Sequence, residues 1–451
     1  MMQQATKTYY FLGIGGIGMS ALARYFKRQG HHVSGYDKTP TSLTQQMIHE
    51  GIDIHFNEDI SKIPSTVDLV IYTPAIPKEH SEYQYILKND FIIKKRAEVL
   101  GEITKDKFSI AVAGTHGKTT ITGMIAHILH TAGIPVDAFI GGLVKNFQSN
   151  LVTSPNAEVA IMEADEYDRS FLWLNPDIAV ISAIDADHLD IYSDKKNLVD
   201  SYHAFAGKIK PGGKLVLKNG LPKPVLQDVS TYLYDSALDS DFYAKDIFVK
   251  DAKFHVTLCL QGEEIPLTLS LPGRHNVENA VAAAAVCSLF GLKTDEIKSG
   301  LETYEGVCRR FDIKFKQGNK AYIDDYAHHP EELRAFISAV KELYPDKKIT
   351  GIFQPHLFSR TMHFAAEFAH VLDLLDEAIL LDIYPARELP IEGITSNTIL
   401  EKMTIENKKI VSKNKLLEEL REKDTEVLLT MGAGDIDQLV EPITALLKEK
   451  K

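Results

Sequence analysis

The chain has 451 residues, of which 44% are hydrophobic and 25% charged, and it carries a formal net charge of −12. This length suggests about three domains of a soluble globular protein, and the negative charge argues against nucleic acid as the main partner. No apolar run approaches the ~18–20 residues that span a bilayer, no signal-peptide pattern opens the chain, and the three cysteines lack C-x-x-C spacing, so we expect a cytoplasmic protein with no membrane insertion, disulfide framework or zinc site.

The first segment, residues 1–107, begins with a strand that leads into a glycine turn, Gly13-x-Gly15-x-x-Gly18, and then a helix. Asp37 ends the next predicted strand, about twenty residues further on, where an acid can bind a ribose hydroxyl. The glycines could instead serve only close packing of the helix on the strand. Since any diphosphate-bearing ligand can use this turn, the pattern predicts such a ligand and does not single out nicotinamide.

The central segment, residues 108–308, opens with an apolar strand, the loop Gly114-Thr-His-Gly-Lys-Thr-Thr120 and a helix. This layout is typical of a phosphate-binding loop, although the usual first glycine falls at Val112. Lys118 would reach the outer phosphates, and the Thr119 hydroxyl would bind Mg²⁺. An ordinary glycine-rich turn is the alternative interpretation.

The next two predicted strands cover residues 158–163 and 178–184, and an acidic cluster follows each of them. In the first cluster, 163–168, Glu163 comes directly after the apolar run, where Mg²⁺ is held in phosphoryl-transfer sites. The second cluster, 185–190, contains His188, which could complete a metal site or orient a carboxylate. A solvated acidic turn and a structural histidine are the alternatives.

Residues 231–271 alternate polar and apolar, which predicts an antiparallel β insertion or edge, and an alanine-rich helix is predicted over 277–289. Just before it, Asn276 suits a helix cap as well as it suits a purine contact.

The third segment, residues 309–451, again alternates strands and helices. Three clusters rich in Arg, Asp and His follow its apolar runs, at 309–310, 324–330 and 354–360. Arginine in such places suits capture of carboxylate or phosphate, although any one cluster could be a surface ion pair.

The glycine turn, the phosphate loop, both acidic clusters and the three later clusters occur in an order that resembles the Mur ligases of peptidoglycan synthesis over nearly the whole chain. The resemblance implies three α/β domains: an N-terminal Rossmann-like domain for a UDP-sugar, a central P-loop ATPase domain with an antiparallel β portion, and a C-terminal Rossmann-like domain that closes over ATP.

The reaction that the resemblance implies is joining of L-alanine to the lactyl carboxylate of UDP-N-acetylmuramate through an acyl phosphate, with ATP and Mg²⁺ and release of ADP and phosphate. A monomer or homodimer is expected. The related ligase that adds a recycled murein tripeptide to the same UDP-sugar is the alternative. A dehydrogenase would explain only the first segment, and a P-loop switch or motor only the second.

Site residues also follow from the resemblance. ATP binding is implied for Gly114, Thr115, His116, Gly117, Lys118, Thr119, Thr120, Asn279, Arg310 and Asp324. Metal binding is implied for Thr119, Glu163 and His188, and catalytic roles for Lys118, Glu163, His188, His328, His356 and Arg360. The UDP-sugar site is implied for Gly15, Gly16, Asp37, Thr73, Ala75, Ile76 and Arg96.

The chain departs from the family pattern at two positions. Many relatives have Arg where Leu357 stands here, so recognition of the alanine carboxylate would depend more on Arg360. Phe205 occupies the place of the carbamylated lysine of other Mur ligases, so Lys208 is not assigned that role.

Overall fold

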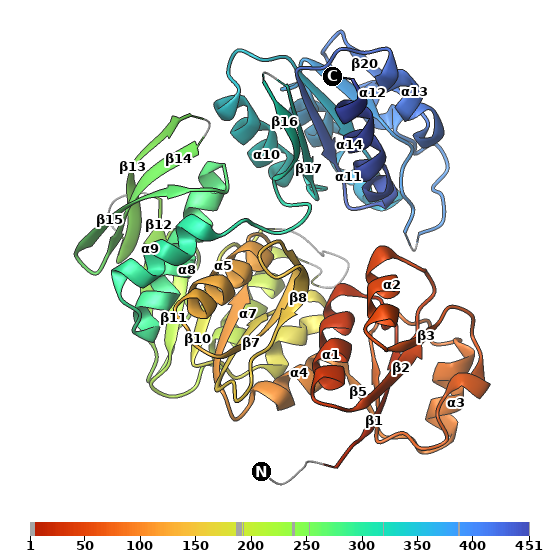
Figure 1. Cartoon of the computed structure of the whole chain (residues 1–451), viewed down its shortest axis with the longest axis vertical. Helices are drawn as coiled ribbons and strands as arrows, with labels where there is room; N and C mark the ends of the chain where they lie inside the picture. Colours follow the sequence, from red (N-terminus) through yellow and green to blue (C-terminus); the bar gives the residue numbers. More distant parts are fainter. Residues whose placement is uncertain are drawn as a thin grey trace. The chain divides into compact units, whose positions relative to one another are not determined.

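The computed structural model describes residues 5–185, 192, 194–236, 240–251, 253–318, 320–386 and 388–450. These residues form two compact units: the first comprises Met1–Lys245, Leu258–Ile265 and Asn279–Tyr304, and the second comprises Asp246–Thr257, Pro266–Glu278 and Glu305–Lys451. Figure 1 gives the order of the elements along the chain. None of the helices in the described ranges has both the length and the apolar character needed to cross a bilayer.

The N-terminal sheet has five parallel strands in the order β3-β2-β1-β4-β5. Its strands are β1 (Thr8–Leu12), β2 (His32–Tyr36), β3 (Asp53–His55), β4 (Leu69–Tyr72) and β5 (Ile93–Lys95). Its helices are α1 (Ile17–Arg28), α2 (Ser42–His49), α3 (Ser81–Lys88) and α4 (Arg96–Thr104). Strand β1 is buried along nearly its whole length, as expected of a central parallel strand covered on both faces.

The central sheet has ten strands in the order β15-β14-β13-β12-β11-β10-β6-β9-β7-β8. Its strands are β6 (Phe108–Ala113), β7 (Val136–Val144), β8 (Ser149–Val152), β9 (Val159–Glu163), β10 (Ile178–Ile181), β11 (Lys214–Lys218), β12 (Ser230–Asp235), β13 (Phe242–Lys250), β14 (Lys253–Leu260) and β15 (Glu263–Leu269). The helices of this part are α5 (Lys118–Thr131), α7 (Lys195–Ala206), α8 (Arg274–Phe290) and α9 (Thr294–Thr303). Helix α5 packs on β6, β7 and β9.

Strands β6, β9 and β10 lie side by side and parallel, so their carboxyl ends share one edge of the sheet. The phosphate loop follows β6, the cluster beginning at Glu163 follows β9, and Ser182 follows β10. In an open α/β sheet, ligands bind at this edge. The fold therefore brings two predicted site segments, the phosphate loop and the cluster that begins at Glu163, to one edge; of the predicted cluster 185–190 after β10, only Asp185 lies in the described residues.

The strands over residues 231–271 differ in part from the antiparallel pairing predicted for them. Strand β12 pairs with β11 in parallel, and the bridge from Tyr234 to Phe242 is also parallel. A two-residue turn with positive φ at Gln261 (51°) and Gly262 (90°), as in antiparallel hairpins, joins β14 to β15. Alternation of polar and apolar residues has the same period of two in both kinds of pairing, so the sequence could not distinguish them.

A buried polar contact joins α1 to β8 within the first unit. Arg24 is 1% exposed; its Nε and Nη2 donate to Glu50 at 2.8 Å each, and its Nη1 donates to Asn150 Oδ1 at 2.6 Å. Asn150 Nδ2 in turn donates to the Ile17 carbonyl at 2.7 Å. Helix α1 also packs on β7 and β8, and one apolar core runs through both sheets. The glycine turn that precedes α1 is therefore fixed relative to the central sheet.

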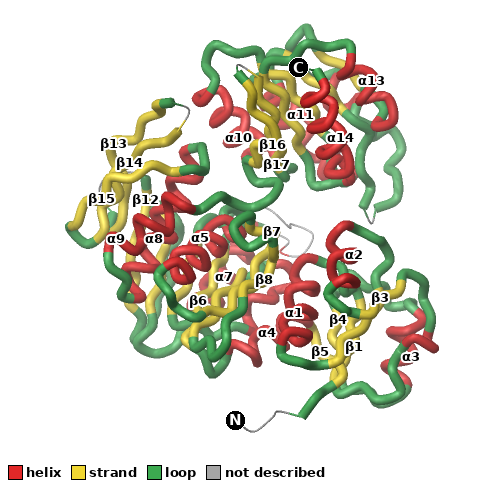
Figure 2. The backbone as a smooth tube through the Cα atoms, viewed as in Figure 1, coloured by secondary structure: helices red, strands yellow, loops and turns green. Residues whose placement is uncertain are grey.

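The C-terminal sheet has six strands in the order β16-β17-β21-β18-β19-β20; β16 is antiparallel to β17, and the other pairs are parallel. Its strands are β16 (Asp312–Gln317), β17 (Lys320–Asp325), β18 (Ile349–Phe353), β19 (Glu377–Leu380), β20 (Lys408–Ile410) and β21 (Val427–Met431). Its helices are α10 (Pro330–Leu343), α11 (Phe358–Leu372), α12 (Asn397–Leu400), α13 (Leu416–Arg421) and α14 (Val440–Glu449). Figure 2 shows helices α10, α11, α13 and α14 in red around the yellow strands of this domain. Along β18, Ile352 packs in the core formed with α13 and α14, and Phe353 contacts Phe368 of α11, so helices cover both faces.

Candidate active site

The glycine turn of the first domain lies against most of the residues predicted to bind the UDP-sugar. Gly13 has φ 84°, and a Cβ there would lie 2.6 Å from Thr73 Cγ2. Gly15 donates its backbone N–H to Asp37 Oδ2 at 2.7 Å. A Cβ on Gly18 would lie 2.5 Å from Arg96 Nη1. Gly16, Ala75 and Ile76 belong to the same two turns, as their backbone bonds to Gly13 and Thr73 show.

A small cavity of about 70 Å³ adjoins this turn. Its lining includes Thr73, Lys95 and Arg96 from the first domain and Asp165, Tyr167 and Ser170 from the segment after β9. Arg96 Nη2 donates to Asp165 at 3.3 Å, and Lys95 pairs with Asp168 at 2.7 Å. The acidic segment after β9 therefore touches the predicted UDP-sugar residues directly.

Two glycines of the phosphate loop have backbone conformations and surroundings that exclude a side chain. Gly114 has φ 138°, and a Cβ there would lie 2.1 Å from Ser182 Oγ. Gly117 has φ 86°, and its Cβ would lie 2.7 Å from Asn279 Oδ1. Asn279, the predicted adenine contact, thus lies beside the loop. Asn276 is not the N-cap of α8, which begins two residues earlier; its Nδ2 donates to the Pro272 carbonyl at 2.6 Å.

The residues after β10 hold the loop in place. The Thr115 N–H donates to the Ala183 carbonyl at 3.1 Å, and the Asp185 N–H donates to Thr115 Oγ1 at 3.1 Å. Ser182 Oγ donates to the carbonyl of His116. Lys118, Thr119 and Thr120 form the first turn of α5, so the backbone N–H groups at this helix start are available to an anion.

Lys118 is held by a carboxylate that is not among the residues predicted from the sequence. Its Nζ donates to Glu166 Oε1 at 2.9 Å, to Glu166 Oε2 at 2.8 Å and to the Gly114 carbonyl at 2.5 Å. Burial lowers the pKa of Lys118, but Glu166, with Asp165 and Glu163, outweighs burial and raises it. The sequence shows Glu166 only as a member of the acidic cluster 163–168, and nothing in that pattern identifies it as the partner of Lys118.

Glu163 ends β9, and its side chain is oriented by β7. Its Oε1 accepts the N–H of Gly141 at 2.5 Å, and a Cβ on Gly141 would lie within 2.6–2.8 Å of the carboxylate. Only glycine at position 141 leaves room for this arrangement. The Glu163 carboxylate and the Thr119 hydroxyl carry hard oxygen atoms of the kind that Mg²⁺ prefers, and their binding of the metal stays a prediction.

His188, the third predicted metal ligand, lies outside the described residues. Among the residues that are described, no group of three or more His, Cys, Asp or Glu side chains forms a metal site.

Three of the predicted residues of the third domain follow parallel strands: His328 follows β17, and His356 and Arg360 follow β18, whereas Arg310 precedes β16 and Asp324 lies within β17. The Arg310 guanidinium lies 5.1 Å from the centroid of the Tyr326 ring, and that ring meets the His328 ring edge-on. The His328 and His356 rings are 6.0 Å apart between centroids, at 76°. Arg360 lies in the first turn of α11, just after Leu357, which has φ 69°.

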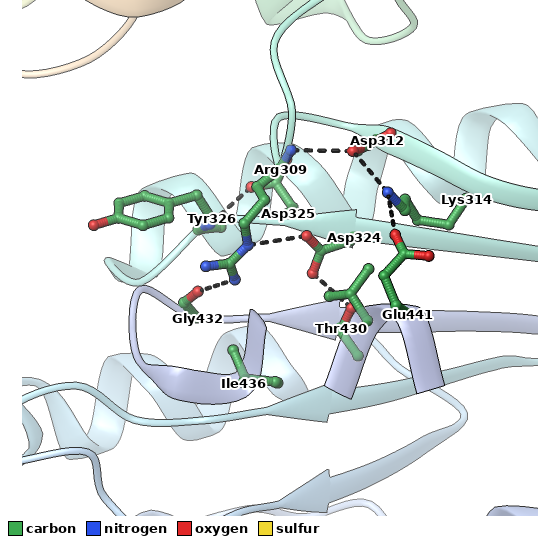
Figure 3. A network of polar contacts seen from close by, with 12 residues as sticks. Arg309, Asp312, Lys314, Asp324, Asp325, Tyr326, Thr430, Gly432, Ile436 and Glu441 are labelled. Carbon is green, nitrogen blue, oxygen red and sulfur yellow. Dashed lines mark hydrogen bonds and ion pairs between the residues drawn. The ribbon is translucent and has the colours of Figure 1, made fainter. Parts of the chain in front are cut away.

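Asp324, the remaining predicted residue of the third domain, lies in a network of polar contacts (Figure 3). Its side chain is fully buried; its Oδ2 accepts from Arg309 Nε at 3.0 Å and its Oδ1 from Thr430 Oγ1 at 2.7 Å. Arg309 Nη2 also donates to the Gly432 carbonyl at 2.7 Å. Burial raises the pKa of Asp324 although Arg309 lowers it. The nucleotide contact predicted for Asp324 stays a prediction; in this structure its carboxylate accepts hydrogen bonds from Arg309 and Thr430.

Asp325 clamps the backbone at the start of the third domain, and its ionisation should influence stability. Its carboxylate accepts the N–H groups of Phe311 at 2.6 Å and Ala327 at 2.8 Å, and burial raises its pKa from 3.8 to about 6. A raised pKa in the folded state means that protonation favours folding, so this contribution is present at low pH and lost as pH rises through about 6. When the pH is lowered from about 7.5 to about 5, the free energy of unfolding of the protein should rise by about 1.4 kcal/mol relative to that of Asp325→Asn.

Urea denaturation at the two pH values measures this change, with Asp346→Asn, at an exposed position, as the control. The difference between the protein and the control variant should stay constant with pH. A pH-independent difference for Asp325→Asn as well would contradict the assignment.

Three family models match the chain in succession. They are described as Mur ligase family, catalytic domain (residues 8–108), Mur ligase middle domain (112–287) and Mur ligase, glutamate ligase domain (309–434). The chain belongs to the Mur ligase family. The domain boundaries at 107/108 and 308/309 themselves stay predictions.

Several known proteins match this Mur ligase over nearly its whole length. The UDP-N-acetylmuramate–L-alanine ligase of Flavobacterium psychrophilum is 50% identical over 446 residues, which are 98% of each chain. The crystal structure of a UDP-N-acetylmuramate–alanine ligase from Thermotoga maritima matches with a TM-score of 0.84 and 27% identity, over 99% of this chain and 100% of that one. A murein peptide ligase from Psychrobacter arcticus matches over 98% of each chain, with a TM-score of 0.74 and 23% identity, and shares the fold. The predicted three-domain α/β fold is confirmed.

Proposed function

We propose that this Mur ligase joins L-alanine to the lactyl carboxylate of UDP-N-acetylmuramate at the expense of ATP, releasing ADP and phosphate in the cytoplasm. The observation that carries the proposal is 50% identity, over 98% of both chains, to a ligase named for that reaction. The phosphate loop with Lys118 beside the Glu163 segment supports it independently, because this is the arrangement that phosphoryl transfer needs.

The chemistry follows from the weakness of a carboxylate as an acyl donor. Transfer of the γ-phosphoryl group of ATP to the lactyl carboxylate gives an acyl phosphate, from which phosphate can leave when the alanine amine attacks the carbonyl. Lys118 and the N-terminus of α5 offset the negative charge that gathers when a carboxylate approaches a triphosphate. Mg²⁺, when bound, would neutralise further charge on the phosphates.

We propose a role for each of the remaining predicted residues, in binding either Mg²⁺ or a substrate. Thr119, Glu163 and His188 would hold Mg²⁺, and Asn279 would contact adenine. Arg310 and Asp324 would contact nucleotide, while His328, His356 and Arg360 would position alanine and the acyl group. The first-domain residues around Gly15, Asp37, Thr73 and Arg96 would bind the UDP-sugar. A monomer or homodimer is part of the proposal.

The test is phosphate release from ATP in the presence of UDP-N-acetylmuramate, screened across single amino acids and the murein tripeptide. Release should require both partners and be strongest with L-alanine. Strongest release with the tripeptide would establish the recycling ligase instead, and release independent of the UDP-sugar would indicate an unrelated ATPase.

A further inference from the structure

The ammonium group of Lys118 has no N–H donor left for a phosphate in this structure. A lysine ammonium has three donors. Here the three acceptors are Glu166 Oε1 at 2.9 Å, Glu166 Oε2 at 2.8 Å and the Gly114 carbonyl at 2.5 Å. A nucleoside triphosphate can therefore bind Lys118 through a hydrogen bond only after one of these contacts breaks.

Of these contacts, the ion pair with Glu166 is the one that a bound phosphate would weaken. The Glu166 side chain is 2% exposed, so its carboxylate depends on a nearby cation, and Lys118 supplies it. An incoming phosphate brings negative charge to the same ammonium and repels the carboxylate. The Gly114 carbonyl carries no charge and is part of the loop backbone, so it can keep its contact.

The main chain at Glu166 is anchored, which leaves the side chain to move. The Glu166 carbonyl accepts from the Tyr192 hydroxyl and from the Arg169 N–H, the latter at 3.0 Å. Asp168 and Arg169 both have φ 53°, so the chain turns sharply just after Glu166. A rotation about the side-chain torsions of Glu166 would separate its carboxylate from Lys118 without unfolding this turn.

We infer that Glu166 is a built-in anion that occupies Lys118 in the absence of nucleotide, and that the outer phosphates of ATP must displace it. The inference rests on the proposed function, because it assumes that ATP binds at Lys118. Glu166 is then a positioning residue: it holds the Lys118 ammonium in place before ATP arrives, and it lowers the apparent affinity for nucleotide by competing for that lysine.

The test compares Glu166→Gln with the protein in calorimetric titrations with the non-hydrolysable ATP analogue AMP-PNP and Mg²⁺, without UDP-sugar or amino acid. Glutamine keeps the size of the side chain and removes the charge that competes with phosphate. If Glu166 holds Lys118 in about nine of ten ligand-free molecules, the variant should bind about tenfold more tightly. A merely structural role would leave the affinity unchanged or weaken it.

Asp137→Asn is the matched control. Asp137 is also 2% exposed and paired with a lysine, Lys107, which immediately precedes β6, whereas the phosphate loop follows that strand. The control variant should bind AMP-PNP as the protein does, within about twofold, because the strand places this pair about 20 Å from the loop.

Two results would overturn the inference alone: AMP-PNP binding by Glu166→Gln that is no tighter than that of the protein, or a crystal structure with AMP-PNP bound in which Lys118 still contacts both Glu166 oxygens. The second measurement uses the unaltered protein and so does not depend on the folding of the variant. Failure of the protein to bind AMP-PNP, or equally tight binding by Lys118→Ala, would overturn the proposed function together with the inference.

Discussion

Replacing Lys118 with alanine is expected to lower the kcat/KM for ATP by about 10²- to 10⁴-fold, measured as phosphate release with UDP-N-acetylmuramate and L-alanine. The ammonium lies at the start of α5, where the outer phosphates would sit, and no other lysine belongs to this helix. Its loss removes a positive charge that stabilises the transferring phosphoryl group. Activity within about threefold of the unaltered protein would contradict the role of Lys118.

The same substitution should also destabilise the fold, because it leaves the buried Glu166 carboxylate without its cation. Loss of one partner of a buried ion pair costs about 3–5 kcal/mol. The double variant Lys118→Ala/Glu166→Gln should recover most of this stability in urea denaturation and remain inactive.

Lys107→Ala is the matched control for stability. Lys107 and Lys118 have similar exposure, 19% and 17%, and each pairs with a carboxylate that is 2% exposed. Lys107→Ala should be destabilised to a similar degree yet turn over normally at temperatures where it is folded. Equal loss of activity in both variants would mean that unfolding, and not the chemistry, explains the effect.

Replacing Glu163 with glutamine should lower turnover by about 10²- to 10⁴-fold and raise the Mg²⁺ concentration needed for half-maximal activity. Glutamine keeps an oxygen that can accept the Gly141 N–H, so the fold should survive. The lost negative charge weakens a ligand that a divalent cation needs.

Glu158→Gln is the control for this change, since Glu158 is exposed and immediately precedes β9, the strand that Glu163 ends. Its activity and Mg²⁺ dependence should match those of the unaltered protein. An unaltered Mg²⁺ dependence in Glu163→Gln would remove Glu163 from the metal site.

Features set by short stretches of sequence could be predicted well. The strand, loop and helix around Lys118 are observed as β6, the loop at 114–117 and α5, and Glu163 does end a strand beside them. The glycine turn at Gly13–Gly18 also lies where predicted. These features depend on spacing of glycines and apolar residues within about twenty positions, which the sequence displays directly.

Partners that are distant in the chain could not be predicted. Lys118 and Glu166 are 48 positions apart, and Arg24 and Asn150 are 126 positions apart. Their contacts depend on which strands become neighbours and which side chains then point inward, and periodicity carries no information about either. The same reason explains why the parallel pairing of β12 was not foreseen.

The contact of Arg24 with Asn150 bears on how the first two domains came to depend on each other. Cut out alone, residues 1–107 would keep Glu50 but lose Asn150, the acceptor of the third hydrogen bond of the buried Arg24 guanidinium, and would expose the face of α1 that rests on β7 and β8. A segment that looks modular by its motifs is thus not autonomous, and the two sheets should melt together as one cooperative body. Homologous exchange of this segment between relatives would then succeed only where the residues equivalent to Arg24 and Asn150 are inherited as a pair.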